Sequence, residues 1–142
     1  MRYLVDTNVL LELFLIREKH DSVQSFFVNA LIRKNQTYVS AMSLRDFGYF
    51  IHKNVHDKEK TKIMLMRLHE MISKVVDTTA DAAIESIYSE NNDYEDSMQM
   101  ITAEEAMCDA IITYNKKDFE KSNLPVFTPE EMNDIWLKEN RL

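Results

Sequence analysis

Length, composition and charge exclude several classes of protein. The chain has 142 residues, 45% of them hydrophobic and 29% charged, with only one Gly and two Pro. This is about the size of one domain, and collagen-like, low-complexity and disordered chains are excluded. The single cysteine, Cys108, excludes an intrachain disulfide and a zinc site built on thiolates, and the net charge of −7 argues against broad binding to duplex phosphates.

The sequence also lacks the features of a membrane or secreted protein. Its longest apolar stretch lies within residues 9–16 and is interrupted by Glu12, far short of the roughly 20 residues that a bilayer span needs. The first six residues do not follow the order of a signal peptide, which is a basic start, an apolar centre and a cleavage site. We therefore expect no membrane association and a cytoplasmic location.

Short apolar runs alternate along the chain with stretches of helical periodicity. The runs typical of buried strands are 2–5, 37–39, 75–76, 110–113 and 126–127. Apolar residues at helical spacing predict helices just after the first strand and over 21–34, 43–53, 61–73, 80–90, 94–108 and from 128 onward. In the helix over 80–90 we expect Ala83, Ile84 and Ile87 to face inward.

This alternation predicts the fold class. It is typical of an α/β three-layer sandwich with a mostly parallel central sheet of about four to five strands flanked by helices. We expect residues 1–142 to form one domain. Because ligands of such sheets bind beyond the carboxyl ends of the strands, the polar residues at those ends are the candidates for function.

Acidic residues follow the predicted strands or open the predicted helices. They are Asp6 after the first strand, Asp118 shortly after the fourth together with Asn115, and Asp46 and Asp96 near helix starts. Neighbouring parallel strands end at one edge, so these residues can meet in one cleft. Carboxylates gathered without Lys or Arg need a hard divalent cation, and oxygen ligands favour magnesium or manganese. Such a site would activate water for hydrolysis of a phosphodiester.

Each acid also has a purely structural interpretation. Residues 43–46 and 93–96 resemble capping boxes, in which the fourth residue bonds back to the first amide of the helix. A single Asp after a strand forms a turn more often than a catalytic site. Only the combination of these acids, in order along the chain, favours the functional interpretation.

Four segments together resemble the PIN domain family, in order and over nearly the whole chain. They are 4–11 (LVDTNVLL), 39–46 (VSAMSLRD), 93–99 (DYEDSMQ) and 110–119 (AIITYNKKDF). The resemblance implies an α/β sandwich whose acidic residues bind magnesium or manganese for cleavage of single-stranded or structured RNA. Small free-standing members resemble VapC-type toxins of type II toxin–antitoxin pairs, which implies an antitoxin partner and a homodimer.

The same resemblance implies a role for each site residue. Asp6, Asp46 and Asp96 would be the first, second and third acids, and Asn115 or Asp118 would fill the fourth place. The implied metal ligands are Asp6, Asp96 and Asp118, with Asp46 completing the catalytic set and Asn8 and Thr113 supporting the site through hydrogen bonds.

The sequence departs from the family pattern at two of these positions. Asp46 stands where the second acid is often Glu, and its side chain reaches one methylene less. Asn115 stands where an acid is often found, which leaves Asp118, three residues further on, to supply the charge. These departures keep open a second function, a non-catalytic PIN-like module that binds RNA or protein.

Two enzyme classes that use an Asp after the first strand fit less well. Phosphatases that resemble haloacid dehalogenase use such an Asp as nucleophile and have a second Asp two residues later, where this chain has Asn8. Phosphorylation receivers need an acidic pair after the first strand, which is also missing. The one glycine, Gly48, lies within a predicted helix, so a glycine-rich phosphate loop is excluded.

Two further segments leave alternatives open. A basic segment between predicted helices either contacts RNA phosphates or is simply solvated; it contains His52, Lys53, His56, Lys58, Lys60 and Lys62. The predicted helices near the N-terminus would offer an apolar groove to an antitoxin helix if four of their side chains are exposed, namely Leu10, Leu13, Phe14 and Phe47.

Overall fold

Five parallel strands form the central sheet of the structure, a computed structural model that describes residues 1–91 and 93–140. The strand order across the sheet is β3-β2-β1-β4-β5. The strands are β1 (Arg2–Val5), β2 (Gln36–Ser40), β3 (Lys74–Val76), β4 (Ala110–Ile112) and β5 (Val126–Phe127). The predicted α/β sandwich is therefore confirmed, and the sheet is parallel throughout.

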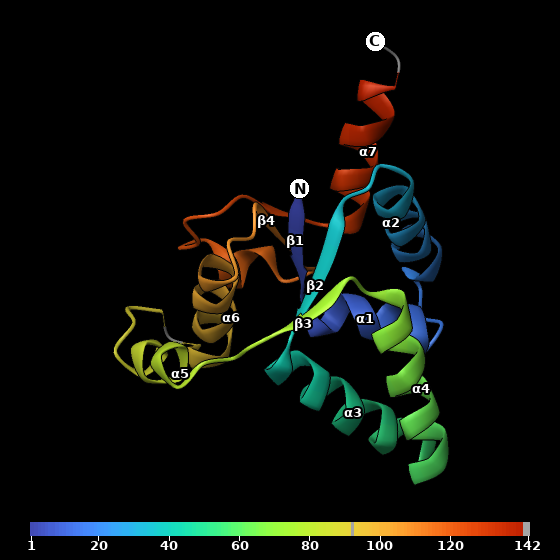
Figure 1. Cartoon of the computed structure of the whole chain (residues 1–142), viewed down its shortest axis with the longest axis horizontal. Coiled ribbons are helices and arrows are strands. Elements are labelled where there is room, and N and C mark those ends of the chain that lie inside the picture. The colour runs from blue at the N-terminus through green and yellow to red at the C-terminus, as the bar shows by residue number, and fades with distance from the viewer. Residues whose placement is uncertain (92, 141–142) are drawn as a thin grey trace.

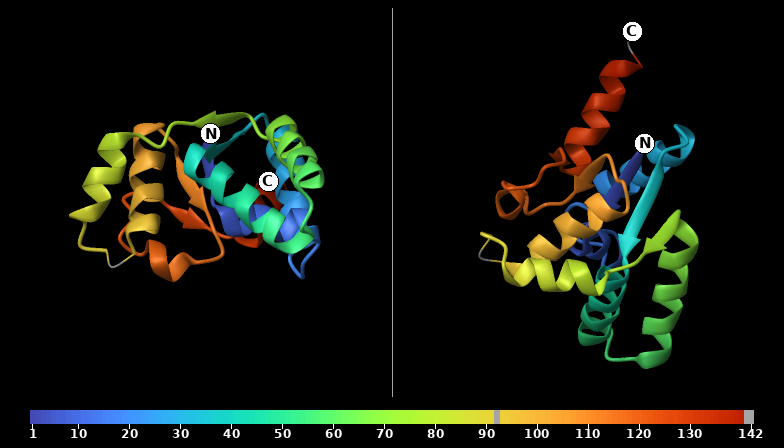
Figure 2. Two further views of the ribbon diagram at one scale, coloured as in Figure 1. Left: turned by 90° about the horizontal axis from the view of Figure 1, so that it is seen from below. Right: turned by 60° about the vertical axis from the view of Figure 1, so that its left-hand side comes forward.

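Helices cover both faces of this sheet (Figures 1 and 2). One hydrophobic core lies between the sheet and α1, α2, α3, α4 and α7, and a second core lies between the sheet and α6. The helices are α1 (Thr7–Phe14), α2 (His20–Ile32), α3 (Ala41–Val55), α4 (Lys58–Met71), α5 (Ala80–Ile87), α6 (Tyr94–Glu105) and α7 (Pro129–Glu139), with a short 3-10 helix, η1 (Lys116–Phe119).

The central strand β1 shows why the sheet is buried on both sides. Successive side chains of a strand point to opposite faces, and here Tyr3 and Val5 enter the larger core while Leu4 enters the smaller one. All three are at most 1% exposed. A continuous apolar run is therefore the pattern that a central parallel strand requires.

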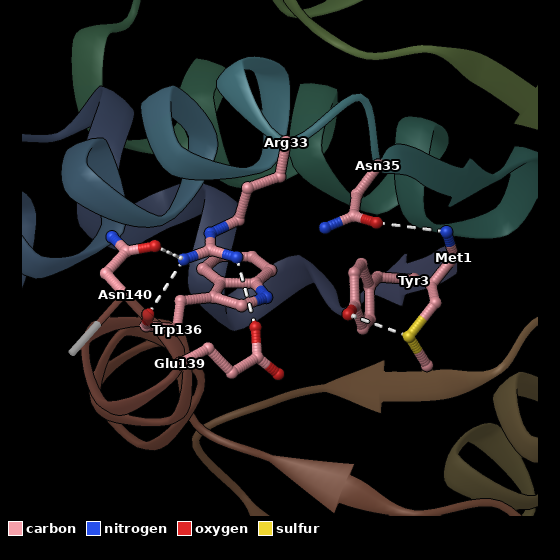
Figure 3. Close-up of polar contacts among 7 residues, drawn as sticks. All are labelled: Met1, Tyr3, Arg33, Asn35, Trp136, Glu139 and Asn140. Carbon is pink, nitrogen blue, oxygen red and sulfur yellow. Dashed lines mark hydrogen bonds and ion pairs between the residues drawn. The ribbon is translucent and has the colours of Figure 1, made fainter. Parts of the chain in front are cut away.

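The C-terminal helix α7 is attached to α2 by Arg33 (Figure 3). The Arg33 guanidinium donates to Glu139 Oε2 at 3.0 Å, to the Trp136 carbonyl oxygen at 2.7 Å and to Asn140 Oδ1 at 2.6 Å. The Trp136 ring stacks on Phe26, with ring centroids 5.6 Å apart. Arg33 thus adds a second donor to the Trp136 carbonyl oxygen, which also accepts from the Asn140 N–H at 3.1 Å, while the Trp136 side chain anchors the helix in the core.

Helix starts differ from the sequence prediction at two places. Helix α3 begins at Ala41, because Ser40 caps it by accepting a hydrogen bond from the Ser43 N–H, so the capping box expected at 43–46 is wrong. Helix α4 begins at Lys58 after its cap Asp57, which places much of the predicted basic loop on a helix. By contrast, Asp93 does cap α6, accepting from the N–H groups of Glu95 and Asp96.

Several predictions of burial are also wrong. On α5 the buried residues are Ala82 and Ser86, whereas Ile84 and Ile87 are 56% and 68% exposed. The apolar groove expected near the N-terminus is not formed as predicted, because Leu10 and Phe47 are fully buried in the larger core and Leu13 and Phe14 pack against it.

The remaining structural predictions concern connections and membranes. The polar residues 91–93, between the helices predicted over 80–90 and 94–108, fall between α5 and α6. Of these, Asn92 lies outside the described residues. Within residues 1–91 and 93–140, no helix is long and apolar enough to span a bilayer.

Candidate active site

Asp6 lies where β1 passes into α1, and only 8% of its surface is exposed. Its N–H donates to the Ile112 carbonyl oxygen at 2.9 Å, which extends the pairing of β1 with β4 by one residue. Its side chain then caps α1 by accepting from the Thr7 N–H at 2.9 Å. The change from central strand to helix thus fixes a carboxylate at the carboxyl edge of the sheet.

Four hydrogen bonds occupy the two oxygens of the Asp6 carboxylate. Oδ1 accepts from the Thr7 N–H and from Gln99 Nε2, the latter at 3.1 Å. Oδ2 accepts from Thr113 Oγ1 at 2.8 Å and from Asn8 Nδ2 at 3.1 Å. Burial raises the pKa of Asp6, and the hydrogen bonds from these four residues offset only part of that effect. The carboxylate is therefore held in one orientation, and its ionised form is costly in free energy at this buried position.

Asn8 and Thr113 join the ends of the two strands that flank the site. Asn8 Nδ2 donates to Thr113 Oγ1 at 3.2 Å, and Asn8 Oδ1 accepts from the Tyr114 N–H at 3.1 Å. Thr113 Oγ1 also accepts from the Asn115 N–H at 3.0 Å. These bonds orient both the Asp6 carboxylate and the loop that follows β4.

Gln99 on α6 connects Asp6 to the start of α3. Its Nε2 donates to Asp6 Oδ1 and, at 2.7 Å, to Ser43 Oγ, while its Oε1 accepts from Ser40 Oγ at 2.7 Å. Gln99, Ser40 and Ser43 are all buried. The sequence analysis missed these three residues, although Gln99 lies three positions after Asp96, a spacing that places both on one face of a helix.

Asp96 lies in the first turn of α6 and is partly buried. The pKa of Asp96 is raised to about 7, chiefly by burial and then by the negative charges of Asp93, Asp6 and Asp118, in that order. Like charges that share a poorly solvated region disfavour one another's ionisation. Asp6 and Asp96 therefore act on each other electrostatically although they are 90 residues apart in sequence.

A cleft of ≈ 250 Å³ brings together three of the four acids predicted to be catalytic. Asp6, Asp46 and Asp96 line this acidic cleft, as do the predicted supporting residues Asn8 and Asn115. The other residues that line it are Thr7, Leu11, Met42, Phe50, Glu95 and Gln99. Glu95 is a further acid at the cleft that the sequence analysis did not single out.

Asp46 and Asp118 occupy different positions relative to the cleft. Asp46 lies one turn into α3, and its Oδ1 accepts from Arg45 Nη1 at 3.0 Å. Asp118 is exposed on η1 and is not among the residues that line the cleft, although its charge reaches Asp96. Asn115, rather than Asp118, therefore forms the cleft wall after β4.

The donor chemistry of the cleft fits a hard divalent cation. Within the described part of the chain, no three His, Cys, Asp or Glu side chains lie close enough together to hold a metal ion, so Asp6, Asp96 and Asp118 do not form a three-acid site. However, the described residues lining the cleft include four acids and no Lys or Arg. Magnesium is commonly held by one or two carboxylates with water completing its shell, and Asp6 and Asp96 are two carboxylates that line this cleft.

Replacing Gln99 tests how strongly the buried network supports the site. We expect Gln99→Leu to lower the free energy of unfolding by about 2 kcal/mol, because Asp6, Ser43 and Ser40 each lose a buried partner. Urea denaturation measures this change. Gln24→Leu on the exposed side of α2 is the control, with an expected change below about 0.5 kcal/mol. Equal effects of the two substitutions would contradict the network's role.

The raised pKa of Asp96 predicts a pH-dependent stability. Between pH 3.8, the ordinary pKa of an Asp side chain, and about pH 7, the unfolded chain is ionised at Asp96 while the folded chain stays protonated there. The folded state then binds more protons, so stability falls as pH rises through this window. In metal-free buffer we expect Asp96→Asn to melt higher than wild type at pH 8, by roughly 3 °C after discounting for partial exposure, with little difference at pH 4. A difference that does not vary with pH would refute this.

Several solved structures have folds similar to that of this chain. Solved structures with a similar fold include VapBC2 from Rickettsia felis bound to a DNA fragment from their promoter, with a TM-score of 0.66 and 19% identity over 89% of this chain and 97% of that one. A toxin–antitoxin complex from Klebsiella pneumoniae has a TM-score of 0.64 and 25% identity, covering 91% of this chain and 98% of that one. Mycobacterium tuberculosis VapC20, described as a Sarcin-Ricin loop cleaving toxin, has a TM-score of 0.65 and 11% identity over 86% and 95%.

Sequence comparisons give the assignment itself. No curated protein sequence matched the chain. The family model described as PIN domain matches residues 2–117, which include Asp6, Asp46, Asp96 and Asn115. Since this match spans most of the 142 residues, the chain belongs to the PIN domain family.

Proposed function

We propose that the chain is a metal-dependent endoribonuclease that cleaves single-stranded RNA and acts as the toxin of a type II toxin–antitoxin pair. Membership of the PIN domain family supports a nuclease. The similar folds of VapBC2, the Klebsiella complex and VapC20, which are described as toxins or toxin–antitoxin complexes, support the biological setting.

One observation carries this proposal: four acidic side chains line one cleft, and among the described residues only Asp46 of these four is paired with a basic group, the Arg45 guanidinium. Asp6 is almost fully buried, and its charge contributes to raising the pKa of Asp96. Carboxylates in such surroundings are stable as anions only when a cation joins them. A fold that maintains this arrangement through buried hydrogen bonds is suited to binding a divalent ion.

Asp6 and Asp96 would hold magnesium or manganese, with Asp118 as a more distant third acid. When bound, the ion would neutralise the negative charge that develops on the phosphodiester and favour ionisation of a bound water. Hydrolysis joins the water oxygen to phosphorus and breaks the bond to the leaving ribose oxygen, which takes up a proton.

The remaining residues would position these groups. Asp46, at the cleft wall, would accept a hydrogen bond from the attacking water. Asn115 would donate its side-chain amide to a phosphate oxygen, a contact that is possible without adding charge to the cleft. Asn8, Thr113 and Gln99 would keep the Asp6 carboxylate in one orientation through the bonds described above.

A non-catalytic PIN-like module that binds RNA or protein is the second candidate. The observation that favours it is that no three acids among residues 1–91 and 93–140 form a group able to hold a metal ion. In addition, the four hydrogen bonds to Asp6 occupy all of its usual acceptor positions. A cation would have to displace one of them.

Cleavage of a labelled single-stranded RNA distinguishes the two candidates. We expect wild type to cleave with magnesium or manganese and not with chelator, and Asp6→Asn and Asp96→Asn each to lose at least about 100-fold in rate. Asp134→Asn, an exposed acid of α7, is the control and should retain activity. Unchanged cleavage by Asp96→Asn contradicts the nuclease mechanism. No cleavage by wild type, combined with no rise in melting temperature on adding manganese, favours the binding module.

We also propose an antitoxin protein as partner and a homodimer as the free form. Two exposed apolar patches are available for these contacts. Helix α2 exposes Val28, Leu31 and Ile32, and helix α5 exposes Ile84, Ile87 and the adjoining Tyr88. Ile84, Ile87 and Tyr88 stand at positions i, i+3 and i+4, so they form one stripe. We assign self-association to this stripe. The α2 patch is assigned to the antitoxin.

Sedimentation velocity tests this assignment. We expect wild type to sediment as a dimer of the 16.8 kDa chain and Ile87→Glu to sediment as a monomer, because the substitution places a charge in the apolar contact. Leu31→Glu on α2 is the matched control and should remain dimeric. A wild-type monomer at all concentrations, or monomers from both variants, would contradict the assignment.

A further inference from the structure

We propose that helix α3 is a platform for single-stranded RNA that leaves the acidic cleft, with Phe50 stacking on a nucleobase and Lys53 contacting a phosphate. This inference rests on the proposed function for the identity of its ligand. It adds a contact surface beyond the acidic residues, and the proposed mechanism gives no role to Phe50 or Lys53.

Two adjacent stripes of side chains run along α3 from the cleft outward. The first contains Met42, Asp46, Phe50 and Lys53, and its first three members line the acidic cleft. The second contains Arg45, Tyr49 and His52, with His56 just beyond it at the C-cap of the helix, and all four are exposed. Because residues three and four apart lie next to each other on a helix, each stripe is a continuous track. The first track starts at the cleft, and the second runs beside it, where Arg45 bonds to Asp46. Helices α3 and α4 lie at the end of the molecule opposite α7 (Figure 1).

Aromatic rings are exposed on these tracks, where burial would be expected. Phe50 is 39% exposed and Tyr49 is 53% exposed, and their ring centroids lie 5.3 Å apart. The Arg45 guanidinium lies over the Tyr49 ring, 5.6 Å from its centroid. Aromatic rings with a nearby guanidinium form the usual surface on which bases of single strands stack.

The charge distribution supports a polyanionic ligand at this location. Residues 41–71, which form α3, α4 and their connection, carry six Lys and Arg against four Asp and Glu, a net charge of +2 in a chain of net charge −7. Long-range attraction of RNA by the whole chain is therefore unfavourable, and binding has to come from local contacts. The α3 platform combines the two kinds of local contact available, base stacking and isolated phosphate contacts.

The length of the platform matches more than one nucleotide. Phe50 follows Asp46 by one helical turn, and Lys53 follows Phe50 by nearly another, which together extend about 10 Å along the helix axis. A phosphate held at the acids would thus be followed by a base at Phe50 and a further phosphate near Lys53. Stacking is tolerant of sequence because every base has a π-face, so the platform would contribute affinity rather than choice of target.

Binding in the absence of cleavage tests the platform. We would measure the anisotropy of a fluorescein-labelled 12-nucleotide single-stranded RNA of random sequence, titrated with Asp96→Asn protein in chelator. In that background, Phe50→Leu should weaken binding about tenfold through loss of stacking, and Phe50→Trp should retain it. Leu137→Ala, which removes a comparably exposed apolar side chain (49%) from α7, is the matched control and should have no effect.

A second variant tests the phosphate contact. Lys53→Gln should reduce the slope of log Kd against log salt by about 0.7, the value for one phosphate contact to a single strand. Lys138→Gln on exposed α7 should leave that slope unchanged. No RNA binding up to 100-fold excess over the labelled strand, or equal weakening by Phe50→Leu and Leu137→Ala, overturns the platform. Because these titrations need neither metal nor cleavage, loss of the platform and failure of the nuclease are separate outcomes.

Discussion

The burial of a single carboxylate organises this molecule. Asp6 follows the central strand, caps the first helix and accepts hydrogen bonds from residues of α1, α6 and the end of β4. Each of these partners compensates part of the desolvation of the carboxylate, and each is itself tied to another element. Removing the charge from this position would leave several buried donors without acceptors, a larger loss than that of one contact.

The same constraint explains the composition of the cleft. The described residues that line the cleft include no Lys or Arg. Arg45, outside this lining, bonds to Asp46, and Lys116 pairs with Glu131 at 2.9 Å. An internal ion pair with Asp6 would neutralise the site and remove its attraction for a cation. The uncharged donors Asn8, Gln99 and Thr113 hold the carboxylate in place without neutralising it. The negative charge of Asp6 can therefore still attract a cation.

Local patterns predicted some features well and others poorly. The order of strands and helices followed from apolar runs and periodicity, because a parallel sheet buried on two faces requires uninterrupted apolar strands such as β1. The positions of Asp6, Asp96 and Asn115 at the cleft followed from the topology of the sheet edge.

The bonds of Gln99 to Ser40 and Ser43 could not be predicted, since they join residues more than 50 positions apart and depend on how α6 packs. The exposure of Ile84 and Ile87 was missed for a similar reason: a short apolar helix has no intrinsic preference for which side is covered.

The connectivity of the Asp6 network also affects how the protein is made. Strand β1 is synthesised first but lies in the middle of the sheet, where it needs β2 on one side and β4, more than 100 residues later, on the other. The Thr113 hydroxyl that bonds to Asp6 is likewise more than 100 residues away from it in the chain. Closure of such distant contacts is slow and occurs late in folding, so a nascent or truncated chain ending before β4 has no assembled cleft. The acidic cleft is therefore assembled only after the chain has been synthesised beyond β4.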